Sequence, residues 1–316
     1  MLRAAYRSIV RILPVSVKAP IKRVALSIVG NPSVSIVGSP PVQPQRDEPV
    51  TLPIDPVIPP IDPVIQARME LAESYFRSAK SEISKWAHHS RENDNFTFDL
   101  TEQNLDYLAA TVSTVTGIAL DTIRSYLQEP KVDLHDYLSV KAAGLPIDNP
   151  TSFSRRLGWY AIARATKPRV VIETGVHHGL GSVLLCSALK RNAEEGAPGK
   201  YYGTDIDTSA GVLLAAPFDQ YGKILYGDSI ASLQTIDEPI DLFINDSDHS
   251  AEYEAREYAV VESRLSPKSV VLGDNSHVTN KLFEFSAKTG RQFLFFKEQP
   301  KNHWYPGAGI GISFRR

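Results

Sequence analysis

Acidic and amide side chains follow two apolar segments in the C-terminal half of the chain, where they could bind a divalent cation. The first segment ends in Asp246, and the second ends in Asp274 and Asn275. Neighbouring parallel strands end at one edge of a sheet, so these side chains are expected to lie together. Two carboxylates and an amide oxygen are hard ligands that suit Mg²⁺. We therefore predict a magnesium site at Asp246, Asp274 and Asn275, with Asp248 as the alternative to Asp246.

A histidine lies close to this predicted metal site in the sequence. His249 is three residues after Asp246, so its imidazole could face the same cavity. An imidazole titrates near neutral pH and can take a proton from a substrate hydroxyl. We predict that His249 is the catalytic base, and His277 is the competing candidate.

A glycine-rich turn after the apolar run 170–172 predicts a second binding site. Gly175, Gly179 and Gly181 allow a tight turn and a close approach to a ligand, and an apolar helical stretch follows them. Strand, glycine turn and helix form the nucleotide-binding opening of a doubly wound α/β sheet. The glycine spacing argues against a nicotinamide oxidoreductase, and the lack of a following Lys-Ser or Lys-Thr pair argues against a P-loop. Glu173 ends the strand and suits a cationic, amine-bearing ligand.

Acidic residues after the next two predicted strands extend this second site. Asp205 lies where a carboxylate can accept both hydroxyl protons of a ribose, and Asp207 is the alternative. Asp228 and Ser229 follow the third predicted strand at the corresponding place. The acid after the second strand therefore favours a ligand that contains a ribose.

The stretch 169–182 resembles motif I of the class I methyltransferases, although His177 stands where many members carry a glycine. The polar residues after the fourth and fifth strands are similar to those of metal-dependent small-molecule O-methyltransferases. That group includes the catechol and caffeoyl-CoA enzymes and macrolide-sugar and cephalosporin-type relatives. The resemblance covers about residues 154–314. It implies S-adenosylmethionine as cofactor, with Asp228 and Ser229 at the adenine, and Mg²⁺-assisted methyl transfer to a hydroxyl of a small molecule or sugar.

Alternating strand and helix patterns are expected to position these residues. The sequence predicts an α/β fold, a doubly wound Rossmann-like seven-stranded sheet whose last strand is antiparallel. A helical region precedes the sheet, with Asp99 as the expected cap of one helix, and residues 153–166 are expected to form the helix before the first strand. The expected strands are 170–172, 201–205, 223–226, 240–245, 269–272, 292–296 and 310–314.

Changes in composition divide the chain into four parts. Residues 1–38 are a basic amphipathic leader, in which residues 1–23 are a candidate contact for an anionic membrane surface; a targeting leader or a solvated tail are the alternatives. Residues 39–65 are a proline-rich linker, expected to be extended and without packed structure. Residues 66–150 are expected to form a helical cap over the substrate, and residues 151–316 the cofactor-binding domain.

Composition and charge limit the possible functions. A chain of 316 residues with 42% hydrophobic and 22% charged residues is typical of a soluble globular protein, and a net charge of −2 argues against a nucleic-acid partner. The single Cys186 excludes an internal disulfide and favours a cytoplasmic location. Two alternatives stay open: a metal-free N- or O-methyltransferase, and a non-catalytic adenosine-ligand-binding protein tethered to a membrane or partner. An oligomer is compatible with the sequence.

Overall fold

The computed structural model describes residues 62–92, 97–274 and 276–315, which belong to a compact unit that spans Ile61–Arg316. The basic leader and most of the proline-rich linker lie outside the described residues. The membrane contact of residues 1–23 therefore stays a prediction. Among the helices that the structure describes, none combines the length and the apolar character needed to cross a bilayer.

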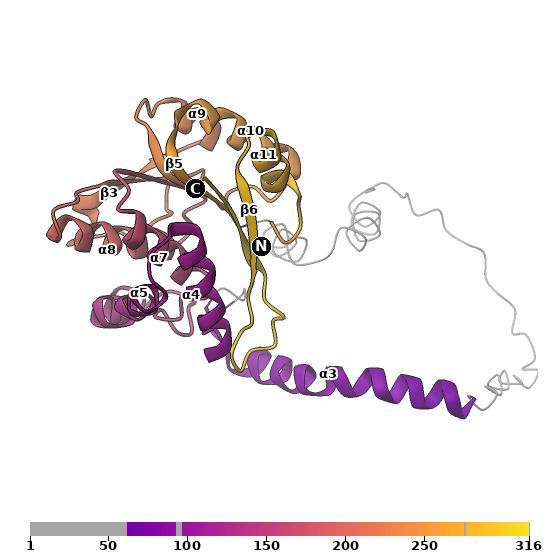
Figure 1. Ribbon diagram of the computed structural model, residues 1–316. Helices are drawn as coiled ribbons and strands as arrows, with labels where there is room; N and C mark the ends of the chain where they lie inside the picture. The colour runs from indigo at the N-terminus through magenta and orange to yellow at the C-terminus, as the bar shows by residue number, and fades with distance from the viewer. Residues whose placement is uncertain (1–61, 93–96, 275, 316) are drawn as a thin grey trace, which may run out of the picture. The chain divides into compact units, whose positions relative to one another are not determined.

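A seven-stranded sheet forms the centre of this unit (Figure 1), with strand order β3-β2-β1-β4-β5-β7-β6. The strands β1 to β5 are parallel, and β7 runs antiparallel to both β5 and β6. The predicted fold class and all seven predicted strands are confirmed. The strands are β1 Val170–Thr174, β2 Lys200–Asp205, β3 Gly222–Tyr226, β4 Ile240–Asn245, β5 Leu265–Gly273, β6 Gln292–Lys297 and β7 Gly309–Phe314.

Helices cover both faces of the sheet (Figure 1). On one face lie α4 Glu102–Thr116, α5 Leu120–Asp133, α7 Arg156–Thr166 and α8 Leu180–Glu194. On the other lie α9 Ser229–Gln234, α10 Ala251–Val261 and α11 Lys281–Lys288. The remaining described helical segments are α3 Pro63–His89, α6 His135–Lys141, η1 Asp219–Tyr221 and η2 Glu262–Arg264.

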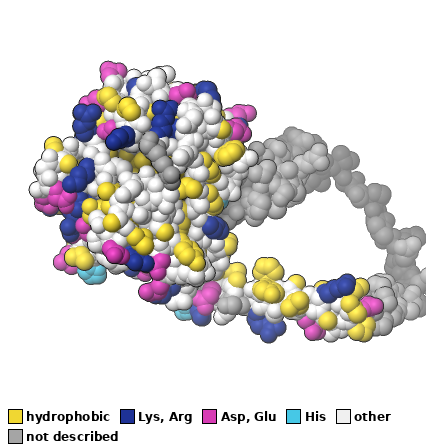
Figure 2. Space-filling model, in the orientation of Figure 1, with side chains coloured by type: hydrophobic (Ala, Val, Ile, Leu, Met, Phe, Trp, Pro, Cys, Tyr) yellow, Lys and Arg dark blue, Asp and Glu magenta, His cyan; other side chains and the backbone are white. Residues whose placement is uncertain are grey.

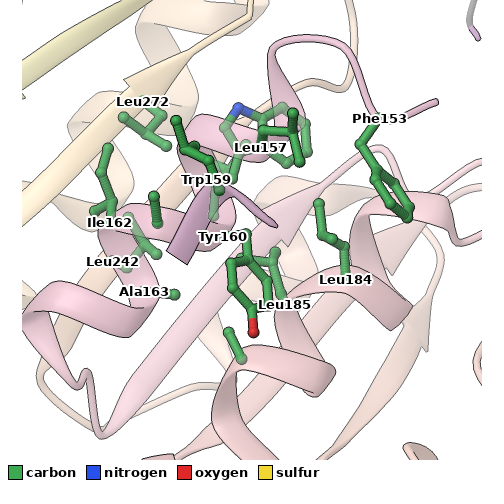
Figure 3. Packing of buried hydrophobic residues seen from close by; sticks show 14 of the residues in the cluster. Phe153, Leu157, Trp159, Tyr160, Ile162, Ala163, Leu184, Leu185, Leu242 and Leu272 are labelled. Atoms are coloured by element: carbon green, nitrogen blue, oxygen red, sulfur yellow. The ribbon is translucent and has the colours of Figure 1, made fainter. Parts of the chain in front are cut away.

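The core on the first face is built around α7. Figure 3 shows Trp159, Tyr160 and Ile162 of this helix among side chains of α8, β4 and β5, including Leu184 and Leu242. All five side chains are fully buried. Burying a side chain of this size contributes roughly 1.5–3 kcal/mol. This packing fixes the start of α7 against the sheet, which matters for the site below.

Two helix starts differ from the sequence-based expectations. The cap of α4 is Thr101, whose hydroxyl accepts a hydrogen bond from the Asn104 amide at 3.3 Å, whereas Asp99 forms an ion pair with Lys131. The prediction of Asp99 was therefore wrong by two residues. Helix α3 begins at Pro63, within the predicted linker. Proline suits the first position of a helix, and the side chain of the residue before it provides the cap. That cap is Asp62, which accepts a hydrogen bond from the Val64 amide at 2.7 Å.

Candidate active site

The glycine turn after β1 lies against the end of β4. Gly175 has a φ of +82°, and a Cβ there would lie 2.0 Å from the backbone oxygen of Asp246. Only glycine fits this position. Gly179 also has a positive φ and precedes α8, which starts without a side-chain cap. The amide groups of the first turn of α8 are thus available to a ligand.

Glu173 lies beneath this turn and faces the protein interior. Its side chain is 1% exposed and accepts hydrogen bonds from the hydroxyls of Ser182, at 3.2 Å, and Tyr201. Burial raises the pKa of Glu173 to about 7, although these hydrogen bonds and the charge of Arg156 oppose the shift. A Cβ at Gly181 would lie 2.1 Å from its carboxylate. The structure therefore gives Glu173 a supporting position under the turn, and its contact with a cofactor stays a prediction.

Asp205 joins the end of β2 to the glycine turn. One carboxylate oxygen accepts a hydrogen bond from the His177 amide at 2.8 Å, and the other accepts one from the Asp207 amide at 2.9 Å. Asp207 instead accepts two hydrogen bonds from Ser209 in its own loop. The geometry thus places Asp205 beside the turn, and the choice between Asp205 and Asp207 as the ribose ligand stays a prediction.

Asp228 and Ser229 lie at the end of β3, but their side chains differ in direction. Asp228 caps α9 by accepting a hydrogen bond from the Ala231 amide, and it accepts another from the Tyr253 hydroxyl at 2.7 Å. These two hydrogen bonds lower the pKa of Asp228. The Ser229 hydroxyl donates to Glu257, a buried carboxylate whose pKa is raised by burial. The Asp228 side chain is therefore exposed at the end of β3, whereas Ser229 is buried.

Asp246 and Asp274 lie side by side at the ends of β4 and β5. The Asp246 amide donates to the Thr174 carbonyl, and the Asp274 amide donates to the Asn245 carbonyl, both at 3.0 Å. Their side chains share a hydrogen bond. Burial and the neighbouring charge of Asp274 raise the pKa of Asp246 well above its usual range. The predicted pairing of these two acids is present in the structure.

A guanidinium group binds Asp274. The Nε and Nη2 atoms of Arg155 donate to the two carboxylate oxygens, the latter at 2.6 Å. Burial alone would raise the pKa of Asp274, but the charge and hydrogen bonds of Arg155 outweigh it and lower the pKa. The Arg155 amide also donates to Glu298 at 2.9 Å, and its Nη1 lies 3.3 Å from that carboxylate.

An arginine of the protein itself occupies the predicted metal site at Asp274. Both oxygens of Asp274 accept hydrogen bonds from Arg155. Asn275 lies outside the described residues. Among the residues that are described, no group of three His, Cys, Asp or Glu side chains could hold a metal. The predicted Mg²⁺ site stays a prediction, and a cation of the protein itself compensates the acids in this structure.

The two candidate bases lie near this acid pair. His249 is exposed in the loop before α10, and Asp248 in the same loop accepts a hydrogen bond from the Ser250 amide at 2.7 Å. His277 is partly buried, with Nδ1 3.1 Å from the Asp274 carbonyl oxygen. Burial is the main cause that lowers the pKa of His277, whereas the charge of Asp274 opposes the shift. Both imidazoles thus remain candidates for proton transfer.

Two arginines at the start of α7 were missed by the sequence interpretation. Arg155 binds Asp274, and Arg156 lies near Asp246 and Glu173, whose pKa values its charge lowers. Arg156 is 9% exposed, and its Nη1 atom has no hydrogen-bond partner among the described residues. The consecutive basic residues before a helix that leads into the first strand were the available sequence signal. The helix runs back from the edge at which β1 ends, so both guanidinium groups reach that edge.

Comparison with known proteins gives one family match and several similar solved structures. Residues 172–276 match the family model described as a methyltransferase domain. No curated protein matches the chain. Solved structures that are similar include an O-methyltransferase from Bacillus cereus in complex with S-adenosylhomocysteine (14% identity, 68% of this chain and 99% of that chain, TM-score 0.40). Another is TomG, an O-methyltransferase of tomaymycin synthesis from Streptomyces achromogenes (14% identity, 68% of this chain and 98% of that chain, TM-score 0.39). A third is a methyltransferase from Geobacter sulfurreducens (15% identity, 66% of this chain and 97% of that chain, TM-score 0.41).

The matched segment contains the glycine turn and the ends of β4 and β5. These residues are thus similar to a methyltransferase domain. The structural likenesses are too distant to identify an acceptor, and the roles of individual residues rest on the geometry described above.

Proposed function

We propose that the protein transfers the methyl group of S-adenosylmethionine to a hydroxyl oxygen of a small molecule or sugar. The observation that supports this most is the position of Asp246. Its backbone oxygen contacts the glycine turn at Gly175, and its side chain is hydrogen-bonded to Asp274 on the next strand. Asp246 therefore lies between the region that suits the cofactor and the region that suits an acceptor.

The cofactor is held in this proposal by groups that face the turn. Asp205 binds the ribose hydroxyls, and Asp228 binds the adenine amino group at the end of β3. Arg156, through its unpartnered Nη1 atom, binds the carboxylate of the methionine part, because a buried guanidinium nitrogen without a partner favours an anion. The uncapped start of α8, after Gly179, offers further amide donors to the same end.

The chemical step needs an acceptor oxygen in line with the methyl group and a group that takes its proton. Bound S-adenosylmethionine supplies an electrophilic methyl group on a sulfonium. As the O–C bond forms and the S–C bond breaks, His249 takes the hydroxyl proton, and its exposed position gives it access to solvent afterwards. His277 is the alternative base.

Two versions of this reaction differ in the cation beside the acceptor. In the Mg²⁺-dependent version, Asp246, Asp274 and Asn275 bind the ion, which requires Asp274 to leave Arg155. In the metal-free version, Arg155 stays in place and Asp274 remains neutralised by it. The pair of hydrogen bonds between Arg155 and Asp274 favours the metal-free version.

The test combines binding and turnover. Titration calorimetry with S-adenosylhomocysteine, with and without Mg²⁺, is expected to show binding that does not depend on the ion. Transfer of a labelled methyl group to a panel of phenols, sugars and polyketide alcohols is expected to give an O-methylated product. Tight binding without transfer to any member of the panel would favour the non-catalytic alternative, and transfer only to amines would favour N-methylation.

A further inference from the structure

The long helix α3 has an apolar stripe that the described residues of the chain leave exposed. Met69 is 50% exposed and Phe76 is 70% exposed. Figure 2 shows hydrophobic side chains at the surface along this helix. Only the last turns pack against the domain, where the Trp86 ring lies 5.2 Å from that of Trp304. Most of the stability of a helix in a folded protein comes from packing of its apolar face. A helix of 27 residues whose apolar face is exposed is therefore expected to pack against a partner.

The spacing of the stripe identifies the kind of partner. Apolar residues alternate at intervals of three and four, which is the pattern of a coiled-coil seam. Such a seam fits another helix along its length, because the period of 3.5 residues keeps it facing one partner. The five residues of the seam are Met69, Ala72, Phe76, Ala79 and Ile83.

We propose that α3 pairs with α3 of a second copy of this chain as an antiparallel two-stranded coiled coil. In this arrangement Phe76 packs against Ala79 of the partner subunit, and Ala72 packs against Ile83 of the partner subunit. Each of these layers joins a large and a small side chain, which fills the space evenly. A parallel pair would instead place Phe76 opposite the partner's Phe76 and leave the alanine layers hollow.

Charge also favours a second copy in this orientation. Glu73 and Lys80 flank the seam on the same side of α3, one residue after Ala72 and Ala79. Antiparallel pairing brings Glu73 beside Lys80 of the partner subunit, and the two-fold symmetry repeats the pair. The helix is thus complementary to itself in both shape and charge.

Sedimentation velocity on the full chain tests the proposal. The wild-type protein is expected to be a dimer, and Phe76→Glu is expected to weaken dimerisation about a hundredfold or more, because it buries a charge in the seam. Leu71→Glu is the matched control, since Leu71 is 62% exposed but lies outside the seam, about a third of a turn around α3 from its centre. It should remain a dimer. A monomeric wild type, or equal loss of the dimer in both variants, would overturn the proposal. Circular dichroism checks that each variant keeps its helix.

Cysteine cross-linking tests the orientation. The one native cysteine, Cys186, is buried, so introduced thiols react alone. A mixture of Phe76→Cys and Ala79→Cys chains is expected to form the mixed disulfide under mild oxidation. A disulfide between two Phe76→Cys chains, without the mixed product, would show a parallel pair and contradict the antiparallel register.

Discussion

Arg155 binds Asp274 through two hydrogen bonds and reaches Glu298 with its amide and its Nη1 atom. Three segments far apart in the sequence meet at this buried guanidinium: the start of α7, the end of β5 and the loop after β6. Glu298 in turn accepts a hydrogen bond from the Ala308 amide at 3.0 Å, which fixes the other end of that loop. The arginine therefore organises the edge of the sheet at which the acceptor is expected.

The first prediction concerns metal dependence. Because Arg155 compensates Asp274, we expect methyl transfer to proceed unchanged in EDTA, and added Mg²⁺ not to increase it. The measurement is the rate of product formation after removal of metals, with re-addition of Mg²⁺ as the control. Loss of activity in EDTA and recovery with Mg²⁺ would establish the metal-dependent version instead.

The second prediction concerns stability. Arg155→Met leaves Asp274 and Glu298 buried without their cation, so the free energy of unfolding should fall by about 3–5 kcal/mol. Arg124→Met is the control, because Arg124 forms its ion pairs with Asp106 and Asp121 at the surface. Its effect should be much smaller, because water and salt screen ion pairs at the surface. Urea denaturation of both variants measures the difference. Similar small effects would mean that the buried network contributes little.

The fold and much of the site were predictable from local patterns. The β-branched run before Gly175 and the regular alternation of strands and helices predicted the sheet, and strand ends placed Asp246 beside Asp274. What escaped was the direction of side chains. Glu173 turns inward, where the Tyr201 hydroxyl donates to its carboxylate, and Tyr201 lies 28 positions away in the sequence. The partnership of Arg155 with Asp274 spans 119 positions, so no local pattern shows it.

The third prediction concerns cofactor affinity. Removing the guanidinium in Arg156→Met is expected to weaken S-adenosylhomocysteine binding about 10- to 100-fold, the worth of a hydrogen bond to a charged group. Arg156→Lys should recover part of the loss, because a charge remains near the carboxylate. Calorimetry gives both affinities, with Arg124→Met as the unaffected control. Wild-type affinity in Arg156→Met would remove this residue from the cofactor site.

The fourth prediction separates the two candidate bases. Replacing the true base with alanine should lower the rate of methyl transfer about 10²- to 10⁴-fold while S-adenosylhomocysteine affinity is kept. We expect this result for His249→Ala and a smaller loss for His277→Ala, whose Nδ1 atom is directed to the Asp274 carbonyl. The reverse order of effects would assign the role to His277. In that case, its lowered pKa would place the acidic limb of the rate profile below pH 6.5.

The last prediction follows from the buried carboxyl of Glu173. Its pKa in the folded protein is about 7, against an ordinary value of 4.5. Between these two values the folded state keeps a proton that the unfolded chain has lost, so the free energy of unfolding falls as pH rises through this window. The full loss is at most about 3 kcal/mol, reached above the folded pKa. Below pH 4.5 the effect is absent.

Glu173→Gln keeps an oxygen for the Ser182 and Tyr201 hydroxyls but cannot ionise. The variant should therefore gain stability relative to the wild type as pH rises from 5 to 8. Glu195→Gln is the control, and it should be less stable than the wild type by the same amount at both pH values. The pKa of Glu195 is lowered to about 2 by hydrogen bonds from Arg164 and Lys167, so its ionised form stabilises the fold at neutral pH. Urea denaturation at both pH values measures each difference. If the stability of wild type and Glu173→Gln changes in parallel over this range, Glu173 ionises in the folded protein as readily as in water, and the cost of burying it is compensated by neighbouring donors.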